Sequence, residues 1–313
     1  MYKTLQSIFT FKHLTACCIA FMLFSNAYAE NDSGPIIVTI KPLYSLVAHL
    51  TEGIEKPVLL MKQMQSPHHY TMRPSERRLL SNARMIVWIG PQMESYLSKI
   101  IQQQDTIIVS AIQASDLKLL DRRTKSGHPH SAGEAKQDDQ PDDLSTDPHI
   151  WLSTHNAIAI SRHISQQLIS NDPVNRKQYE NNLRQLITRI TELSAEVKSN
   201  LEDNKQAFIT YHDAYQYFED ENQLNHIDTI SFDEETGVSL KHLRHIRASI
   251  KTNDVQCLVY QPPKPDIIDT LVGQSTIKAT ALDPLGQDIT NEKQAWFIIM
   301  RDITLNFKRC LNS

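Results

Sequence analysis

Three histidines and one aspartate stand where apolar, strand-like runs of the chain meet polar segments. His68 lies shortly after such a run, and His212 and Asp283 end two others. His149 lies where a long polar stretch gives way to an apolar one. Open α/β sheets bind their ligands in the loops at the carboxyl ends of parallel strands. These four side chains can therefore converge on one site, although they are far apart along the chain.

Three neutral imidazoles and one carboxylate are the ligands of a borderline divalent cation, and they favour Zn²⁺ in tetrahedral geometry. Mg²⁺ and Ca²⁺ prefer shells made only of oxygen, and a manganese site would carry more carboxylate. His69 adjoins His68, and only one of two adjacent side chains easily faces a given site. We expect His69 to be an auxiliary ligand or a group that supports the site.

The other histidines are expected to be structural. Five fall within helical patterns, namely His49, His155, His163, His242 and His245, and His226 is expected in a surface loop.

Strand-like runs alternate with helical patterns in both halves of the chain. The expected strands cover residues 36–40, 57–60, 85–89, 106–109, 207–210, 227–230, 257–260 and 279–282. This alternation predicts an α/β protein with mostly parallel sheets covered by helices. Two similar lobes are expected, with the metal site in the cleft between them.

One long helical pattern at residues 172–203 separates the two halves. Asp172 is a candidate N-cap and Pro173 a candidate first helical residue. One apolar stripe follows at steps of three or four residues, made by Tyr179, Leu183, Leu186, Ile190, Leu193, Val197 and Leu201. A rigid helix that joins the two lobes is the favoured interpretation. A coiled-coil arm is the alternative.

Residues 121–146 form a polar loop in which apolar residues are rare. The loop contains His128 and His130 and several acids, so it is either an auxiliary metal-binding segment or a solvated linker.

The sequence of residues 1–29 predicts a secretory signal peptide. Lys3 and Lys12 precede an apolar run, and Ala27 and Ala29 are the small residues that a signal peptidase requires. A membrane anchor is disfavoured because the run is short. A lipoprotein signal ending at Cys17 would place Lys12 inside its apolar core. The predicted organisation is thus a signal peptide, an N-terminal lobe at 30–171 that includes the loop, a linker helix at 172–203 and a C-terminal lobe at 204–313.

Removal of the signal peptide leaves two of the four cysteines, Cys257 and Cys310. In an oxidising compartment a disulfide between them is the default. The net charge of −4 gives no electrostatic case for nucleic acid binding.

Several motifs of the chain resemble those of the ZnuA family, the periplasmic zinc-binding components of bacterial ABC zinc-uptake systems. The similar segments are Ser66-Pro67-His68-His69-Tyr70 with Arg73-Pro74-Ser75, Val87-Trp88-Ile89-Gly90-Pro91, Asp147-Pro148-His149-Ile150-Trp151-Leu152, Tyr211-His212-Asp213-Ala214-Tyr215 and Leu282-Asp283-Pro284-Leu285-Gly286. They occur in the family's order and extend over essentially the whole mature chain.

The resemblance implies a periplasmic protein, expected to be a monomer and not an enzyme, that captures Zn²⁺ and delivers it to a membrane permease. His68, His149 and His212 would be the zinc ligands, with Asp283 in a fourth position that water or a nearby Glu can take. The loop would collect or sense zinc, and Cys257 and Cys310 would form the family's disulfide. Manganese or iron capture and a surface adhesin are alternatives. A zinc hydrolase is disfavoured because no HExxH-like motif is present.

The chain departs from the family pattern at two places. His69 stands where Asp is usual, and Gln261-Pro262-Pro263 replaces a segment expected to contain an acid. The second change removes a charge near the cleft and bears on metal selectivity.

Overall fold

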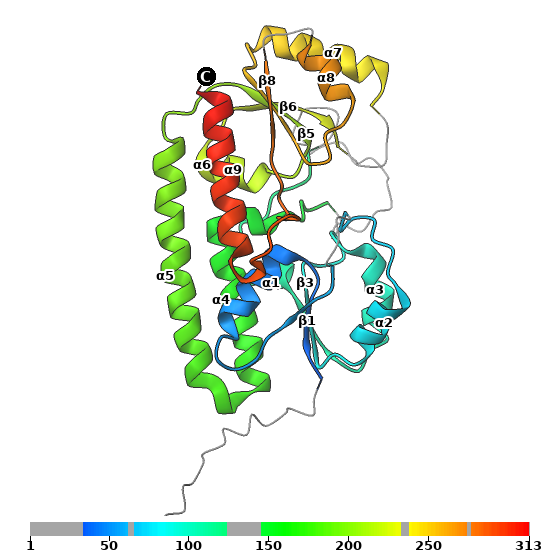
Figure 1. Cartoon of the computed structure of the whole chain (residues 1–313), viewed down its shortest axis with the longest axis vertical. Helices are drawn as coiled ribbons and strands as arrows, with labels where there is room; N and C mark the ends of the chain where they lie inside the picture. The colour runs from blue at the N-terminus through cyan, green and yellow to red at the C-terminus, as the bar shows by residue number, and fades with distance from the viewer. Residues whose placement is uncertain (1–33, 62–65, 124–144, 233–237, 274–276, 313) are drawn as a thin grey trace, which may run out of the picture. The chain divides into compact units, whose positions relative to one another are not determined.

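Two four-stranded sheets, one in each half of the chain, form the framework of the protein (Figure 1). The computed structural model describes residues 34–61, 66–123, 145–232, 238–273 and 277–312. The first sheet has the order β2-β1-β3-β4 and consists of β1 (Ile36–Val38), β2 (Val58–Leu59), β3 (Met85–Trp88) and β4 (Ile107–Ser110). The second has the order β6-β5-β7-β8 and consists of β5 (Phe208–His212), β6 (His226–Ser231), β7 (Cys257–Tyr260) and β8 (Lys278–Ala281).

All strand pairs in both sheets are parallel, and the two sheets share one strand order. Strand β3 shows why the sequence pattern predicts this arrangement. Its four residues are all buried, as a central parallel strand covered on both faces requires. The expected α/β fold with mostly parallel sheets is confirmed.

Helices follow the strands in each half. They are α1 (Lys41–Leu50), α2 (Pro74–Ser81), α3 (Ser95–Ile101), α4 (Thr154–Asn171), α5 (Arg176–Leu201), α6 (Gln216–Asn222), α7 (Leu240–Thr252), α8 (Ile267–Val272) and α9 (Ala295–Leu311). Short 3₁₀ turns cover η1 (Ala111–Gln113), η3 (Ile150–Leu152), η4 (Pro173–Asn175) and η5 (Glu292–Gln294). Among the described residues, no helix combines the length and the apolar character needed to cross a membrane.

The long helix α5 begins later than the sequence pattern predicts. Residues Pro173–Asn175 form the 3₁₀ turn η4, and the α-helix starts at Arg176. Asp172 makes no side-chain cap bond, because its carboxylate accepts hydrogen bonds from the side chains of Asn175 and Tyr179. The apolar stripe of α5 packs against α1, α4 and α9, which excludes a free coiled-coil arm.

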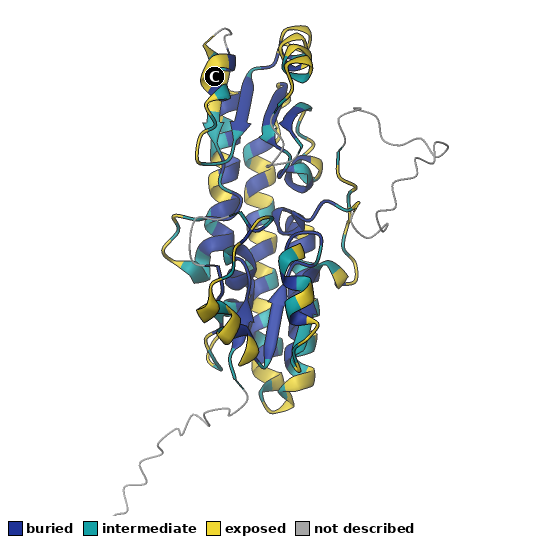
Figure 2. Ribbon diagram, turned by 90° about the vertical axis from the view of Figure 1, so that its right-hand side faces the viewer, coloured by how far each residue is buried: buried dark blue, intermediate teal, exposed yellow. Residues whose placement is uncertain are grey.

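One apolar cluster extends through both halves of the chain. It includes Ile36 of β1, Phe208 of β5, Leu186 of α5 and Phe307 of α9. The other face of each sheet packs into a smaller cluster of its own, one containing Leu97 of α3 and the other Ile246 and Ile268 of α7 and α8. The buried strands therefore lie between helices whose outer faces are exposed (Figure 2).

The disulfide between Cys257 and Cys310 is present and joins β7 to α9.

His226 is not in a surface loop, so that expectation is wrong. It begins β6, its ring packs against Phe208, and its Nε2 lies 3.2 Å from the hydroxyl groups of Thr210 and Thr229. The predicted signal peptide, His128 and His130 lie outside the described residues.

Candidate metal centre

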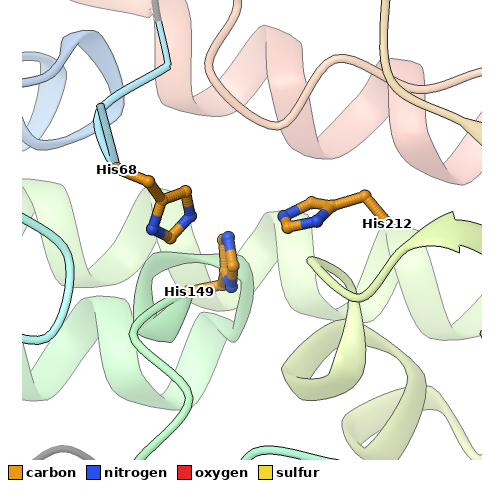
Figure 3. A group of neighbouring side chains, drawn as sticks. All are labelled: His68, His149 and His212. Carbon is orange, nitrogen blue, oxygen red and sulfur yellow. The ribbon is translucent and has the colours of Figure 1, made fainter. Parts of the chain in front are cut away.

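The imidazole rings of His68, His149 and His212 gather at one point (Figure 3). Their ring centroids are 5.4 Å apart for His68 and His149, 5.9 Å for His68 and His212, and 5.4 Å for His149 and His212. One nitrogen from each ring lies within 4.8 Å of the others. Among the described residues, this is the one group of His, Cys, Asp or Glu side chains with such spacing.

These nitrogens are spaced for a small cation. Tetrahedral Zn²⁺ with Zn–N bonds of about 2.0 Å places its ligand nitrogens about 3.3 Å apart, so small ring movements are enough to complete three bonds. The rings border a cavity of about 10 Å³ whose other walls are Pro67, Met93, Trp151, Gln261, Pro284 and Leu285. This volume is close to that of one water molecule. The surroundings are mostly apolar and suit a single ion rather than an organic substrate.

A much larger cavity, of about 680 Å³, is lined by Lys205, Asn225, Asn253 and Gln256 among others. These residues precede β5, β6 and β7, so the cavity lies at the opposite end of the second sheet from His212. It offers amide side chains, one ammonium group and the single carboxylate of Asp254, which do not form a metal-binding set.

His212 is the last residue of β5, and β5 lies between β6 and β7 where the strand order reverses. Sheets of this kind place ligands at such a switch point, outside the carboxyl ends of the strands. The backbone of Ala214 donates to the carbonyl of His212 in a tight turn, and the residue His212 is 8% exposed. The local fold thus presents His212 toward the first half of the chain.

His149 is held by the residue two positions before it. The carboxylate Oδ1 of Asp147 lies 3.0 Å from the backbone nitrogen of His149 and 2.7 Å from its Nδ1. Both side chains are buried, with exposed fractions of 3% for Asp147 and 7% for His149. A carboxylate at Nδ1 fixes the ring and leaves Nε2 as the nitrogen that can bind a metal.

His68 lies in the turn between β2 and α2. The side chain of Ser66 accepts a hydrogen bond from the backbone of His68, and the carbonyl of Ser66 accepts one from the backbone of His69. His68 is half-buried, whereas His69 is exposed and its ring centroid lies 6.3 Å from that of His68. Only one of the two neighbours belongs to the group of three imidazoles.

Asp283 has a different set of contacts. Its Oδ1 accepts hydrogen bonds from the backbones of Leu285 and Gly286, and its Oδ2 accepts one from Gln287. Gly286 has a φ of +63°, and a Cβ there would lie 2.7 Å from Ile289. Asp283 therefore caps a tight loop and is not part of the group of three imidazoles.

A model of the ZnuA family, described as zinc-uptake complex component A, periplasmic, matches residues 36–310. The chain belongs to the ZnuA family. The high-affinity zinc uptake system protein ZnuA of Brucella suis biovar 1 (strain 1330) is 27% identical over 338 residues, with 99% of each chain covered.

A second relative with the same protein name, from Yersinia pestis, is 25% identical over 291 residues, which are 89% of this chain and 92% of the relative. A solved structure titled as the crystal structure of ZnuA has a TM-score of 0.74 at 20% identity and covers 90% of this chain and 100% of the solved chain. The fold of this ZnuA-family chain is therefore the fold of a solved ZnuA.

Three carboxylates of this ZnuA-family chain are linked to the histidine site. Asp147 contacts His149, Asp213 directly follows His212, and Glu219 shares Arg123 with Asp213. Burial raises the pKa of Asp147 to about 7 and that of Asp213 to about 6, and it also raises the pKa of Glu219. The guanidinium of Arg123 opposes this rise in all three acids, and that of Arg122 opposes it in Asp147.

The sequence motif around His149 contains Asp147 but does not by itself indicate a role for it. Its spacing, two residues before His149, is the one sequence signal for that role. No sequence signal indicates a role for Arg122 or Arg123, because their partners are distant in the chain.

Proposed function

We propose that this chain is a solute-binding protein, not an enzyme, that captures Zn²⁺ in the periplasm and delivers it to the permease of an ABC importer. His68, His149 and His212 bind the ion as its protein ligands. The observation that carries this proposal is the convergence of three imidazoles from three separate segments on one small cavity. Membership of the ZnuA family and the names of the relatives support the direction of transport.

Zinc is favoured over manganese or iron by the ligand set. The group contains three imidazoles and, among the described residues, no carboxylate. Nitrogen ligands in a four-coordinate arrangement suit Zn²⁺, whereas Mn²⁺ prefers more oxygen ligands. Metal content after expression in minimal medium tests this choice. An excess of manganese or iron over zinc would support the alternative, and exposure on the surface of intact cells would support an adhesin.

A titration against a chelating zinc indicator tests the ligands. His68→Ala, His149→Ala and His212→Ala should each lower zinc affinity on the order of 100-fold or more, because each removes one of three protein ligands. His155→Ala is the matched control, since His155 is exposed on α4 and outside the site. Wild-type affinity in the three variants, or an equal loss in the control, would contradict the proposal.

The fourth position of the shell is proposed to hold Asp283, water or a nearby Glu. The backbone hydrogen bonds of its loop use both acceptor sites of Oδ1 of Asp283 and one site of Oδ2, so Oδ2 is the oxygen with a site left for an ion. X-ray absorption of the zinc-loaded protein tests Asp283. Four nitrogen or oxygen neighbours that are unchanged in Asp283→Ala exclude Asp283 and leave water or a Glu, and loss of one neighbour identifies Asp283.

Residues 1–29 are proposed to be a cleaved signal peptide, which N-terminal sequencing of the exported protein tests. The proposed lobes are residues 30–171 and 204–313, joined by the helix at 172–203.

His69, His128 and His130 are proposed auxiliary ligands. A second zinc equivalent that disappears when all three are replaced by Ala would support that role. The protein is proposed to act as a monomer, which sedimentation with and without zinc tests.

Transfer to a permease is tested in cells. Deletion of the gene should slow growth in zinc-depleted medium, and the wild-type chain should restore growth. The His149→Ala chain, expressed to the same level, should not restore it.

A further inference from the structure

Two segments of the first half of the chain, residues 117–123 and 145–149, lie side by side and form what we call the interlobe strip. Asp121 and Thr146 pair as an antiparallel bridge. The backbone of Arg122 donates to the carbonyl of Ser145 at 2.8 Å, and that of Asp147 donates to the carbonyl of Leu120 at 2.9 Å. His149 is at one end of this strip, next to Asp147, so the strip determines where His149 lies.

The interlobe strip packs against helix α6 of the second half. The hydroxyl of Tyr217 donates to the carbonyl of Asp147 at 2.7 Å and accepts a hydrogen bond from the backbone of Leu120 at 3.2 Å. The side chain of Gln216 donates to the carbonyl of Asp121 at 3.1 Å. The helix that follows His212 is thus hydrogen-bonded to the strip that carries His149.

Arg123 makes the charged contacts of this interface. One guanidinium nitrogen lies 2.7 Å from Oδ1 of Asp213, and another lies 2.6 Å from Oε2 of Glu219. The side chains of Asp213 and Glu219 are 10% and 2% exposed, so both carboxylates are largely removed from water. Asp213 directly follows His212 in the chain.

Within the part of the chain that the structure describes, Arg123 is the cation that pairs with both Asp213 and Glu219. Burial lowers the pKa of Arg123, but Glu219 and Asp213 raise it and the net shift is upward, so the group is permanently charged. A second ion pair between the strip and α6, Lys118 with Asp220, is exposed, with side-chain fractions of 58% and 36%. Exposed pairs contribute little. The loss of one partner from a buried pair leaves an uncompensated charge and is strongly destabilising.

We propose that Arg123 is a positioning residue of the metal site, which fixes the backbone that carries His212 against the strip that carries His149 by binding Asp213 and Glu219 together. The proposal rests on the zinc-binding function proposed above. Without the guanidinium, two buried carboxylates would repel each other at the turn that follows His212. The third imidazole would then lose its fixed place opposite His149.

The charge of Arg123 and its positioning role predict opposite effects of its replacement on zinc affinity, so one measurement separates them. Replacement of Arg123 by Met removes a positive charge near the site, and on charge alone the variant should bind Zn²⁺ more tightly. If positioning dominates, Arg123→Met should bind more weakly, by about 10- to 100-fold, the usual cost of losing a group that orients a ligand. Arg123→Lys keeps the charge but not the fork that contacts two carboxylates, and should recover only part of the affinity.

The experiment compares the wild type, Arg123→Met, Arg123→Lys, Glu219→Gln and the control Lys118→Met. Zinc affinity is measured by competition, site geometry by the visible absorption of the Co²⁺-loaded protein, and folding by circular dichroism. We expect weaker binding and weaker tetrahedral Co²⁺ bands in Arg123→Met, intermediate values in Arg123→Lys, and a change below about twofold in Lys118→Met.

Unchanged or tighter zinc binding by folded Arg123→Met would overturn the proposal, as would an equal loss in Lys118→Met. If Arg123→Met does not fold, the zinc affinities of Arg123→Lys and Glu219→Gln test the proposal instead. Both should weaken binding at least threefold, and wild-type affinity in both overturns the proposal. If the wild type itself binds no zinc, the proposed function fails. The ring resonances of His212 in the metal-free protein then test the positioning role, which predicts that they shift in Arg123→Lys and not in Lys118→Met.

Discussion

The carboxylate of Asp147 contacts both the backbone nitrogen and the Nδ1 of His149. One acid thereby fixes the position and the tautomer of a candidate zinc ligand before any ion is bound. Both residues are almost entirely buried, so water competes little for this hydrogen bond.

Removal of this carboxylate should weaken zinc binding. Asp147→Ala frees the His149 ring to rotate and to change tautomer, and we expect a loss of about 10- to 100-fold in affinity. Asp147→Asn keeps an acceptor oxygen and should lose less. Competition titrations measure both, with Asp220→Asn, a change at an exposed residue of α6, as control. Equal affinities for the wild type and Asp147→Ala would show that His149 does not need this partner.

Lys41 should contribute to stability across the two halves of the chain. Its ammonium lies 2.7 Å from the carbonyl of Gly286, 2.6 Å from that of Gln287 and 3.0 Å from that of Ile289. Lys41→Met removes these charged hydrogen bonds and should lower the free energy of unfolding by roughly 2 kcal/mol.

Lys293→Met is the matched control for Lys41→Met. It breaks an ion pair with Glu52 whose side chains are 35% and 54% exposed, and should cost less than about 1 kcal/mol. Urea denaturation of the metal-free proteins compares the two. A larger loss in Lys293→Met would contradict the role given to Lys41.

His49 should make stability depend on pH. Burial, with the nearby cations of Arg189 and Lys293, lowers its pKa to about 4, and Glu52 opposes this shift. The unfolded chain binds the proton at higher pH than the folded chain. The free energy of unfolding should therefore fall as the pH drops from about 6.5 toward 4, by about 2 kcal/mol between pH 7 and pH 5 from this group.

The measurement for His49 is urea denaturation of the metal-free wild type and of His49→Gln at pH 7 and pH 5. Gln keeps a hydrogen-bond acceptor beside Arg189 and does not titrate. The stability of His49→Gln should fall less than that of the wild type over this interval. Identical pH dependence in the two proteins would refute the assignment to His49.

The disulfide should stabilise the fold without affecting the metal site. Cys257 and Cys310 are 53 residues apart in sequence, and a cross-link of this span contributes about 4 kcal/mol in the chain-entropy model. The double variant Cys257→Ser with Cys310→Ser should unfold at lower urea and should bind zinc with wild-type affinity when folded. A reductant should destabilise the wild type but not the double variant, and an equal effect on both would argue against the bond.

Much of the fold was accessible from the sequence because local pattern and tertiary structure agree. Strand β3 is a continuous apolar run and is buried on both faces, and the stripe on α5 from Tyr179 to Leu201 faces the core. The three histidines could be predicted because each stands at a strand end or a loop boundary. The parallel topology brings such positions to one place.

The remaining features depend on contacts that periodicity does not encode. Asp172 bonds to Tyr179 rather than capping a helix, and His226 lies in a strand because its ring packs on Phe208. The contacts of Asp283 are determined by the tight backbone of the loop that follows it. The partners of Arg123 are separated from it by about 90 residues or more in sequence, so no local sequence pattern predicts these ion pairs.

The apolar cluster shared by the two halves limits how the protein can release an ion. A wide rotation of one half against the other would separate Ile36 and Leu186 from Phe208 and Phe307, and would expose to water an interior that α5 and α9 now seal. Release of the ion would instead require movement of the turn at Ser66–Tyr70, because His68 is the least buried of the three histidines. A docking permease would then need to displace only a few residues at the rim, while the two deeper imidazoles keep their places.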